Sequence, residues 1–158
     1  MLIFKAINII TTLTRIIFGV VVRHIKRPRH EMNEKELILT KGEQPVATIS
    51  EEELDFLIGR EFPNDKEEVK AKLDKIISTS QIGKNRFSAA VLKLADRDFT
   101  KVDLLVERTL EDFRDIVSLA EYPRAHKAGF KLFDKEEKVI EGVFLADWKE
   151  YSNWKEKK

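Results

Sequence analysis

The sequence predicts a mainly α-helical protein, a small bundle of four or five helices preceded by an amphipathic N-terminal helix. Two observations lead to this fold class, and a third excludes some chemistry. Apolar residues recur at intervals of three and four along most of the chain after residue 50, which is the period of a helix with one buried face. Serine, aspartate and proline stand where such helices would begin and end. Cysteine is absent from the 158 residues, which excludes disulfides, cysteine catalysis and Cys-based zinc sites.

Charge is distributed unevenly along the chain. Residues 1–30 contain six Lys and Arg side chains and no Asp or Glu, whereas the rest of the chain holds 23 basic and 28 acidic side chains. We therefore expect a basic leader over residues 1–31 and a single helical domain over residues 32–158. The acidic balance of the domain argues against nucleic acid as a partner. Two of the three histidines lie in the leader, so neither a metal nor another cofactor is expected.

The leader combines a long apolar run with regularly spaced polar residues. Steps of three and four residues place these on one narrow stripe of a helix, which favours a helix lying in a membrane interface or spanning the bilayer beside a partner helix. The stripe consists of Lys5, Asn8, Thr12, Arg15, Gly19, Arg23 and Lys26. An anionic membrane surface would contact Lys5, Arg15, Arg23, Lys26, Arg27 and Arg29. This predicts a cytoplasmic protein, either peripheral or anchored at the inner membrane through residues 1–26.

Met32 offers a different interpretation of the same leader. If translation starts there, the protein has 127 residues and no membrane segment. A secretory signal peptide fits poorly, because Arg15 interrupts the apolar run and no small-residue cleavage site follows it.

Two short β-prone runs open the domain, at residues 36–40 and 45–49. They predict either a small hairpin or an extended segment. Ser50 and Glu53 form a capping-box pattern, so a first helix is expected from Ser50 until Gly59 and Pro63 end it.

A second helix is expected from Asn64, with an apolar stripe that includes Val69 and Leu73. Gly83 should interrupt the pattern before a third helix, whose buried face would contain Phe87, Ala90, Val91 and Leu94.

Asp98 or Thr100 can cap a fourth, longer helix, which Pro123 should stop. Its apolar stripe consists of Val102, Leu105, Val106, Thr109, Leu110, Phe113, Ile116, Val117 and Ala120. The tail permits two structures. One is a helix from about Asp134, and the other is a hairpin that pairs residues 130–133 with 139–144. We favour the helix, because aromatic residues continue at helical spacing as far as Trp148.

Residues 85–123 carry a recognisable motif. The residues that match it are Arg86, Ala90, Leu92, Lys93, Leu94, Ala95, Asp98, Asp112, Phe113, Arg114, Asp115, Ile116, Ala120, Glu121, Tyr122 and Pro123. The segment resembles a family of small bacterial proteins with the pattern R-x-x-x-A-x-L-K-L-A-x-G-D followed by D-[YF]-R-D-V-L-x-x-A-E-Y-P. Asp147, Trp148, Tyr151 and Trp154 are similar to its D-W-x-x-Y-x-x-W C-terminal helix. The resemblance implies a bacterial origin and a start near Met32, but no activity. Arg97 replaces a usual glycine, so the turn there is expected to differ.

Polar residues cluster around the end of the fourth helix. Four cations and a tyrosine are candidates for an anion pocket, namely Arg86, Lys93, Arg114, Arg124 and Tyr122. Glu121 and His126 are the candidates for acid–base work. The structural interpretation is favoured over this one: Arg114 would pair with a carboxylate between helices, and the Tyr122 hydroxyl would bond a backbone group at the turn. An exposed Trp154 would be the best candidate for a partner contact.

No phosphate-binding loop, metal-ligand spacing or nucleophile motif accompanies this cluster. We therefore expect a non-enzymatic binding or protein-interaction module with a protein partner that the sequence does not identify. The alternative is a small-molecule or anion-handling enzyme that uses Arg86, Arg114, Glu121 and Tyr122.

Overall fold

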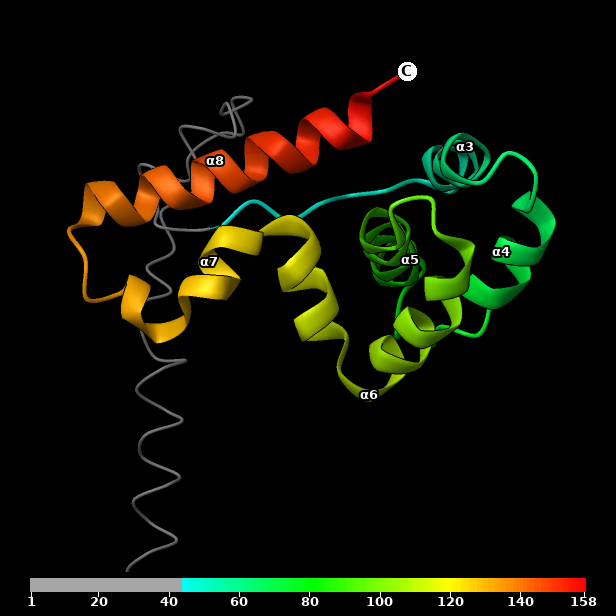
Figure 1. The fold of residues 1–158 in the computed structure, drawn as a ribbon, viewed down its shortest axis with the longest axis horizontal. Coiled ribbons are helices and arrows are strands. Elements are labelled where there is room, and N and C mark those ends of the chain that lie inside the picture. Colours follow the sequence, from blue (N-terminus) through cyan, green and yellow to red (C-terminus); the bar gives the residue numbers. More distant parts are fainter. Residues whose placement is uncertain (1–43) are drawn as a thin grey trace, which may run out of the picture. The chain divides into compact units, whose positions relative to one another are not determined.

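The computed structural model describes residues 44–158 (Figure 1). These residues form helices and contain no strand, which confirms the predicted mainly α class. The elements are α3 (Glu51–Glu61), α4 (Lys66–Leu73), α5 (Gln81–Ala95), η1 (Phe99–Lys101), α6 (Val102–Glu121), α7 (Pro123–Ala128), η2 (Gly129–Leu132) and α8 (Glu137–Glu156). Several expectations lie outside the described residues: the leader helix with its polar stripe and basic side chains, the start at Met32, and the β-prone run 36–40.

The segment before α3 is extended, as one of the two predictions had it. Residues 44–50 form no strand within the described part of the chain, and their side chains alternate between exposed and buried. Ala47 and Ile49 lie in the core, while Val46 is exposed. The Asn85 Nδ2 atom donates to the Ile49 carbonyl at 3.1 Å, which ties this segment to α5.

The predicted capping box opens α3. The Ser50 Oγ atom accepts from the Glu53 amide at 3.1 Å, and the Ser50 amide donates to the Glu53 side chain at 2.8 Å. The next helix begins at Lys66 rather than at the expected Asn64.

The prediction that Gly83 interrupts the helical pattern before the third helix was wrong. Gly83 lies inside α5, where its amide donates to the N-cap side chain of Ser80 at 3.1 Å. A Cβ atom at Gly83 would lie 2.5 Å from the Ser78 Oγ atom. Glycine therefore permits a close approach of the preceding loop instead of ending the helix.

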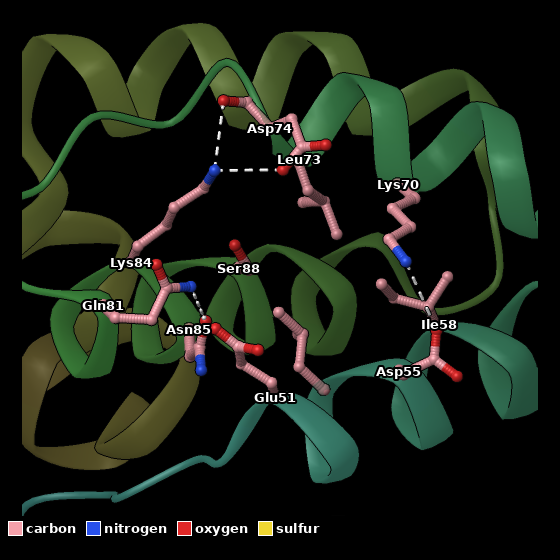
Figure 2. Close-up of a pocket in the computed structure, with 11 residues that line it drawn as sticks. Glu51, Asp55, Ile58, Lys70, Leu73, Asp74, Gln81, Lys84, Asn85 and Ser88 are labelled. Carbon is pink, nitrogen blue, oxygen red and sulfur yellow. Dashed lines mark hydrogen bonds and ion pairs between the residues drawn. The ribbon is translucent and has the colours of Figure 1, made fainter.

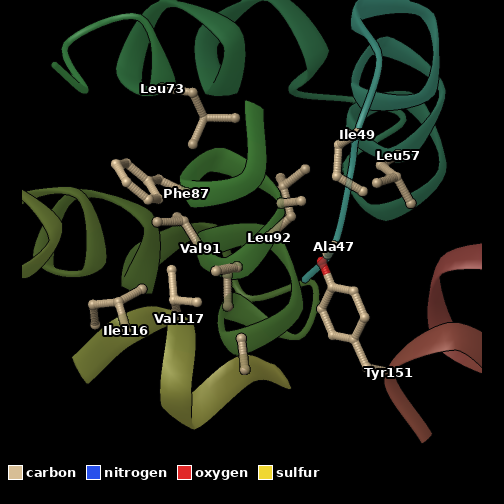
Figure 3. Close-up of a cluster of buried hydrophobic side chains, with 14 of the residues drawn as sticks. Ala47, Ile49, Leu57, Leu73, Phe87, Val91, Leu92, Ile116, Val117 and Tyr151 are labelled. Carbon is tan, nitrogen blue, oxygen red and sulfur yellow. The ribbon is translucent and has the colours of Figure 1, made fainter. Parts of the chain in front are cut away.

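Helix α5 occupies the centre of the core (Figure 3). Five of its consecutive or near-consecutive side chains are fully buried: Ala89, Ala90, Val91, Leu92 and Ala95. The helix contacts α3 on one side and packs extensively along α6. Its alanines allow the neighbouring helices to approach closely, and Val91 and Leu92 fill the space between them.

The turn after α5 contains two residues with positive φ. Asp96 and Arg97 adopt φ values of 50° and 63°, in the left-handed region that glycine enters most easily. Arg97 donates from its Nε atom to the Glu61 carboxylate at 3.1 Å.

Helix α6 is not the continuous helix that its apolar stripe predicts. Asp112 has φ −151° and ψ 97°, which are not helical values, and the ribbon bends sharply within α6 (Figure 1). The Asp112 Oδ1 atom accepts from the Arg114 amide at 3.0 Å. Asp112 therefore acts as the N-cap of a second helical stretch that runs from residue 113 to 121.

Pro123 ends α6 as expected, but it also starts α7 as that helix's first residue. The tail is the helix α8, which confirms the preferred alternative and excludes the hairpin over 130–144. Phe144, Trp148 and Tyr151 turn from α8 into the core.

Candidate functional site

A pocket of about 250 Å³ lies where the extended segment, α5 and the second half of α6 meet. It brings together Arg86, Arg114 and Tyr122, three of the four side chains predicted for an anion-handling site. The remaining lining residues are Gln44, Pro45, Val46, Phe113, Val117 and Ser118. We call these nine residues the Phe113 pocket. Glu121, the fourth predicted residue, does not line it and is fully buried.

Arg86 is joined to Glu121 by two parallel hydrogen bonds. Its Nε and Nη2 atoms donate to the two Glu121 carboxylate oxygens at 2.7 and 2.6 Å. Burial alone would lower the pKa of Arg86, but the hydrogen bonds and the charge of Glu121 outweigh burial and raise it. The buried carboxylate thus compensates the guanidinium charge from within the fold.

Arg114 is paired locally. Its guanidinium donates to both Asp112 oxygens, at 2.8 and 2.7 Å, and these bonds raise the pKa of Arg114. The prediction that Arg114 joins two helices was wrong, because its carboxylate partner is only two residues away. The Arg114 side chain is 77% exposed, so this pair lies in solvent at the mouth of the pocket.

Tyr122 fastens the extended segment to the helices. Its hydroxyl donates to the Pro45 carbonyl at 2.5 Å, a residue 77 positions away in the sequence. The expected bond to a backbone group is present, but it reaches across the fold rather than closing the local turn. The Tyr122 ring packs on Phe144 and Trp148, with ring centres 5.4 and 6.2 Å away.

Lys93 and Arg124 belong to a different cluster, on the side of α8. The Lys93 Nζ atom donates to the Ala120 carbonyl at 2.9 Å, and burial lowers the pKa of this amine. Arg124 binds Asp147 at 2.7 Å and Glu150 at 2.8 Å. These cations therefore do not join Arg86 and Arg114 in one anion pocket.

The sequence patterns did not identify Asp147 as a residue that fixes the start of a neighbouring helix. It is fully buried in α8, and its Oδ2 atom accepts from the backbone amides of Arg124 and Ala125, at 3.0 Å each. It therefore caps α7 from another helix. Spacing gives no sign of this, because capping residues are recognised from sequence only when they adjoin the helix they cap.

Trp154 is not the freely exposed aromatic residue that a partner contact would favour. Its ring is partly buried against the core, with the Tyr151 ring centre 5.6 Å away. The Arg60 guanidinium covers it at 5.2 Å from the ring centre.

Two exposed apolar side chains at the Phe113 pocket were also missed. Phe113 is 44% exposed although it stacks on Phe87 at 4.5 Å, and Val46 is 61% exposed. Phe113 belongs to the apolar stripe that was predicted for the fourth helix. The break at Asp112 changes the course of that stripe, which periodicity alone does not reveal.

Acid–base groups are not gathered at this pocket. His126 is exposed, with its Nδ1 atom 3.1 Å from the Ser118 hydroxyl, and the Glu121 carboxylate is bound by Arg86. Within residues 44–158, no group of three or more His, Asp or Glu side chains is placed to hold a metal ion. The same residues include no helix that is both long and apolar enough to cross a membrane.

Comparison with known proteins identifies no relative of this chain. No protein-family model, curated protein or solved structure matches the chain. The resemblance of residues 85–123 to the bacterial family therefore stays a prediction.

Proposed function

We propose that this chain is a non-enzymatic interaction module that binds a protein partner at the Phe113 pocket. The observation that carries the proposal is the compensation of both pocket cations by carboxylates of the same chain, Glu121 and Asp112. A catalytic or anion-binding arginine needs free donors that point at its substrate. Here the Nε and Nη2 groups of both arginines already donate to carboxylates within the fold, so neither guanidinium presents its bidentate edge to a ligand.

The mouth of the pocket supports an apolar contact. Val46 and Phe113 expose hydrophobic surface on opposite elements, and Pro45 and Val117 line the space between them. With the arginine charges compensated, the pocket fits a partner segment that inserts one apolar side chain.

Site-specific photo-crosslinking in cells tests this proposal. A photoreactive residue at position 46 should capture one partner, and Phe113→Asp should abolish the crosslink. A photoreactive residue at position 149, which is exposed on α8, should not capture the same protein. Equal capture from both positions, or capture that persists in the Phe113→Asp protein, would contradict the proposal.

The anion-handling enzyme is a second candidate, because Arg86, Arg114 and Tyr122 do line one pocket. Titration with inorganic phosphate, followed through the arginine side-chain NMR signals, separates the two functions. The interaction module predicts no saturable shift at millimolar phosphate. Saturable binding that is lost in Arg114→Gln would instead favour the enzyme.

A further inference from the structure

A second cavity, of about 240 Å³, lies between α3, α4 and α5, away from the residues of the Phe113 pocket (Figure 2). Leu54, Ile58 and Leu73 supply its apolar walls. The volume holds about eight water-sized groups. A small organic molecule therefore fits this space.

Ser88 lines this cavity with a hydroxyl that has no hydrogen-bond partner among the described residues. The residue is fully buried, and its oxygen points toward the space that Leu73 borders (Figure 2). Buried hydroxyls are normally bonded, since an unmet hydroxyl destabilises the fold. Alanine at this position would pack as its neighbours Ala89 and Ala90 do. The unsatisfied oxygen therefore points to a ligand.

Asn85 adds a second polar group beside Ser88. Its Nδ2 atom donates to Ile49 and its Oδ1 atom accepts from Gln81 at 2.8 Å, and each atom keeps one further bonding position. The polar end of the cavity can thus both donate and accept.

The rim of the cavity carries one uncompensated negative charge. Lys84 pairs with Asp74 at 3.0 Å. The Asp55 carboxylate is held by Lys66 at 2.7 Å, with Lys70 3.8 Å away. Glu51 also lines the cavity, and none of the ion pairs among the described residues includes it. A cationic group is therefore the charge that the rim favours.

We propose that this cavity binds a small organic amine whose apolar body packs on Leu54, Ile58 and Leu73. The amine's ammonium group lies near Glu51, and a hydroxyl or similar group at its other end bonds Ser88. The binding surface is separate from the Phe113 pocket, so the proposal goes beyond the protein interaction and does not depend on it.

Tyramine is a suitable probe, because it joins an ammonium group, an apolar ring and a hydroxyl. When tyramine is titrated into the full-length protein, the backbone amide NMR signals of Ser88, Asn85 and Leu73 should shift in a saturable way. Phenethylamine lacks the hydroxyl and 4-ethylphenol lacks the ammonium group. Each should bind about tenfold more weakly, the effect of one lost polar interaction.

Variants assign the two polar contacts. Ser88→Ala should weaken tyramine binding about tenfold and should raise the melting temperature of the free protein, so unfolding cannot explain the loss. Glu51→Gln should also weaken binding, whereas the matched control Glu52→Gln, whose side chain does not line the cavity, should not. The proposal is overturned if tyramine gives no saturable shift at millimolar concentration, or if it binds Ser88→Ala and Glu51→Gln as tightly as the wild type.

Discussion

At the scale of single residues, the fold depends on buried carboxylates, each of which receives at least one hydrogen bond from another part of the fold. Glu121 receives two hydrogen bonds from Arg86, and Asp147 receives two backbone amides together with the Arg124 guanidinium. Glu61 is bound by both Arg60 and Arg97. A buried carboxylate without such partners would destabilise the protein, so these residues act as pairs.

The Arg86–Glu121 pair gives the first prediction. Arg86→Leu should lower the free energy of unfolding by about 3–5 kcal/mol, because it leaves the Glu121 charge buried and unpaired. The double variant Arg86→Leu/Glu121→Leu should recover most of the loss, since it removes both charges. Urea denaturation of the two variants measures this. Arg114→Leu is the control, because its pair with Asp112 is exposed. Equal destabilisation by the two single variants would contradict the assigned role.

Tyr151 gives the second prediction. Its hydroxyl is buried with no hydrogen-bond partner among the described residues. Tyr151→Phe should therefore raise the free energy of unfolding at neutral pH by about 1 kcal/mol. Burial also raises the pKa of Tyr151 above its usual 10.0, with the Glu121 charge adding to the effect. Above pH 10 the unfolded chain then releases this proton while the folded chain retains it.

The folded protein consequently loses stability as the pH rises above 10. The Phe variant lacks this contribution, so its advantage over the wild type should grow between pH 9 and pH 11. Urea midpoints measured across that range check the prediction, and a constant difference between the two proteins would contradict it.

At the scale of helices, the ends are held by groups from elsewhere in the chain. Asp147 caps the start of α7, and the Lys93 amine binds the Ala120 carbonyl near the end of α6. The Arg60 guanidinium donates to the Lys155 and Lys157 carbonyls at the end of α8. Cations are favourable at a helix C-terminus, where carbonyl groups lack partners. Helix boundaries here are therefore tertiary features as much as local ones.

The break in α6 gives the third prediction. Asp112→Ala should lower the free energy of unfolding, because it removes the cap of the second stretch, while Asp112→Asn should retain most of the stability. Hydrogen bonds from Arg114 lower the pKa of Asp112 below its usual 3.8. The negative charge of Asp112 therefore stabilises the folded protein at neutral pH. This stabilisation is lost as the pH falls through the lowered pKa.

Chemical denaturation at pH 7 and at pH 3 measures this effect. The difference in the free energy of unfolding between the wild type and Asp112→Asn should be smaller at pH 3 than at pH 7. An Asp112→Ala protein as stable as the wild type at pH 7 would show that the break does not depend on the cap.

At the scale of the whole molecule, the predicted polar cluster divides into two. Arg86, Arg114 and Tyr122 lie at the Phe113 pocket, and Lys93 and Arg124 lie with α8. Each cluster is compensated internally, which supports a structural role for most of its charges. The leader lies outside the described residues, and its membrane association remains a proposal based on sequence.

Cell fractionation gives the fourth prediction. The natively expressed full-length chain should sediment with the membranes, because the leader sequence combines a long apolar run with basic residues that attract anionic lipid. A chain that begins at Met32 is the control and should not sediment. The mass of the natural N-terminus decides whether the leader is made, and a mass that begins at Met32 would end the membrane proposal.

Much of the helical framework could be predicted because its signals are local. The Ser50–Glu53 capping box, the stop at Pro123 and the aromatic spacing around Trp148 each act within one or two turns of a helix. Gly83 and Asp112 were misjudged for a physical reason. Glycine there accommodates a neighbouring loop, and aspartate interrupts a stripe whose apolar period continues past it.

The sequence by itself determined the helical class of the domain, some of its helix limits and its lack of cysteine chemistry, because period, caps and composition are properties of neighbouring residues. Only the tertiary structure decided which charges meet. Arg86 and Glu121 are 35 residues apart, and Tyr122 reaches Pro45 across 77. Such pairs form only after the helices pack, since no local rule links residues so far apart. The same packing leaves Ser88 buried without a partner beside a cavity, a feature that cannot be predicted from spacing.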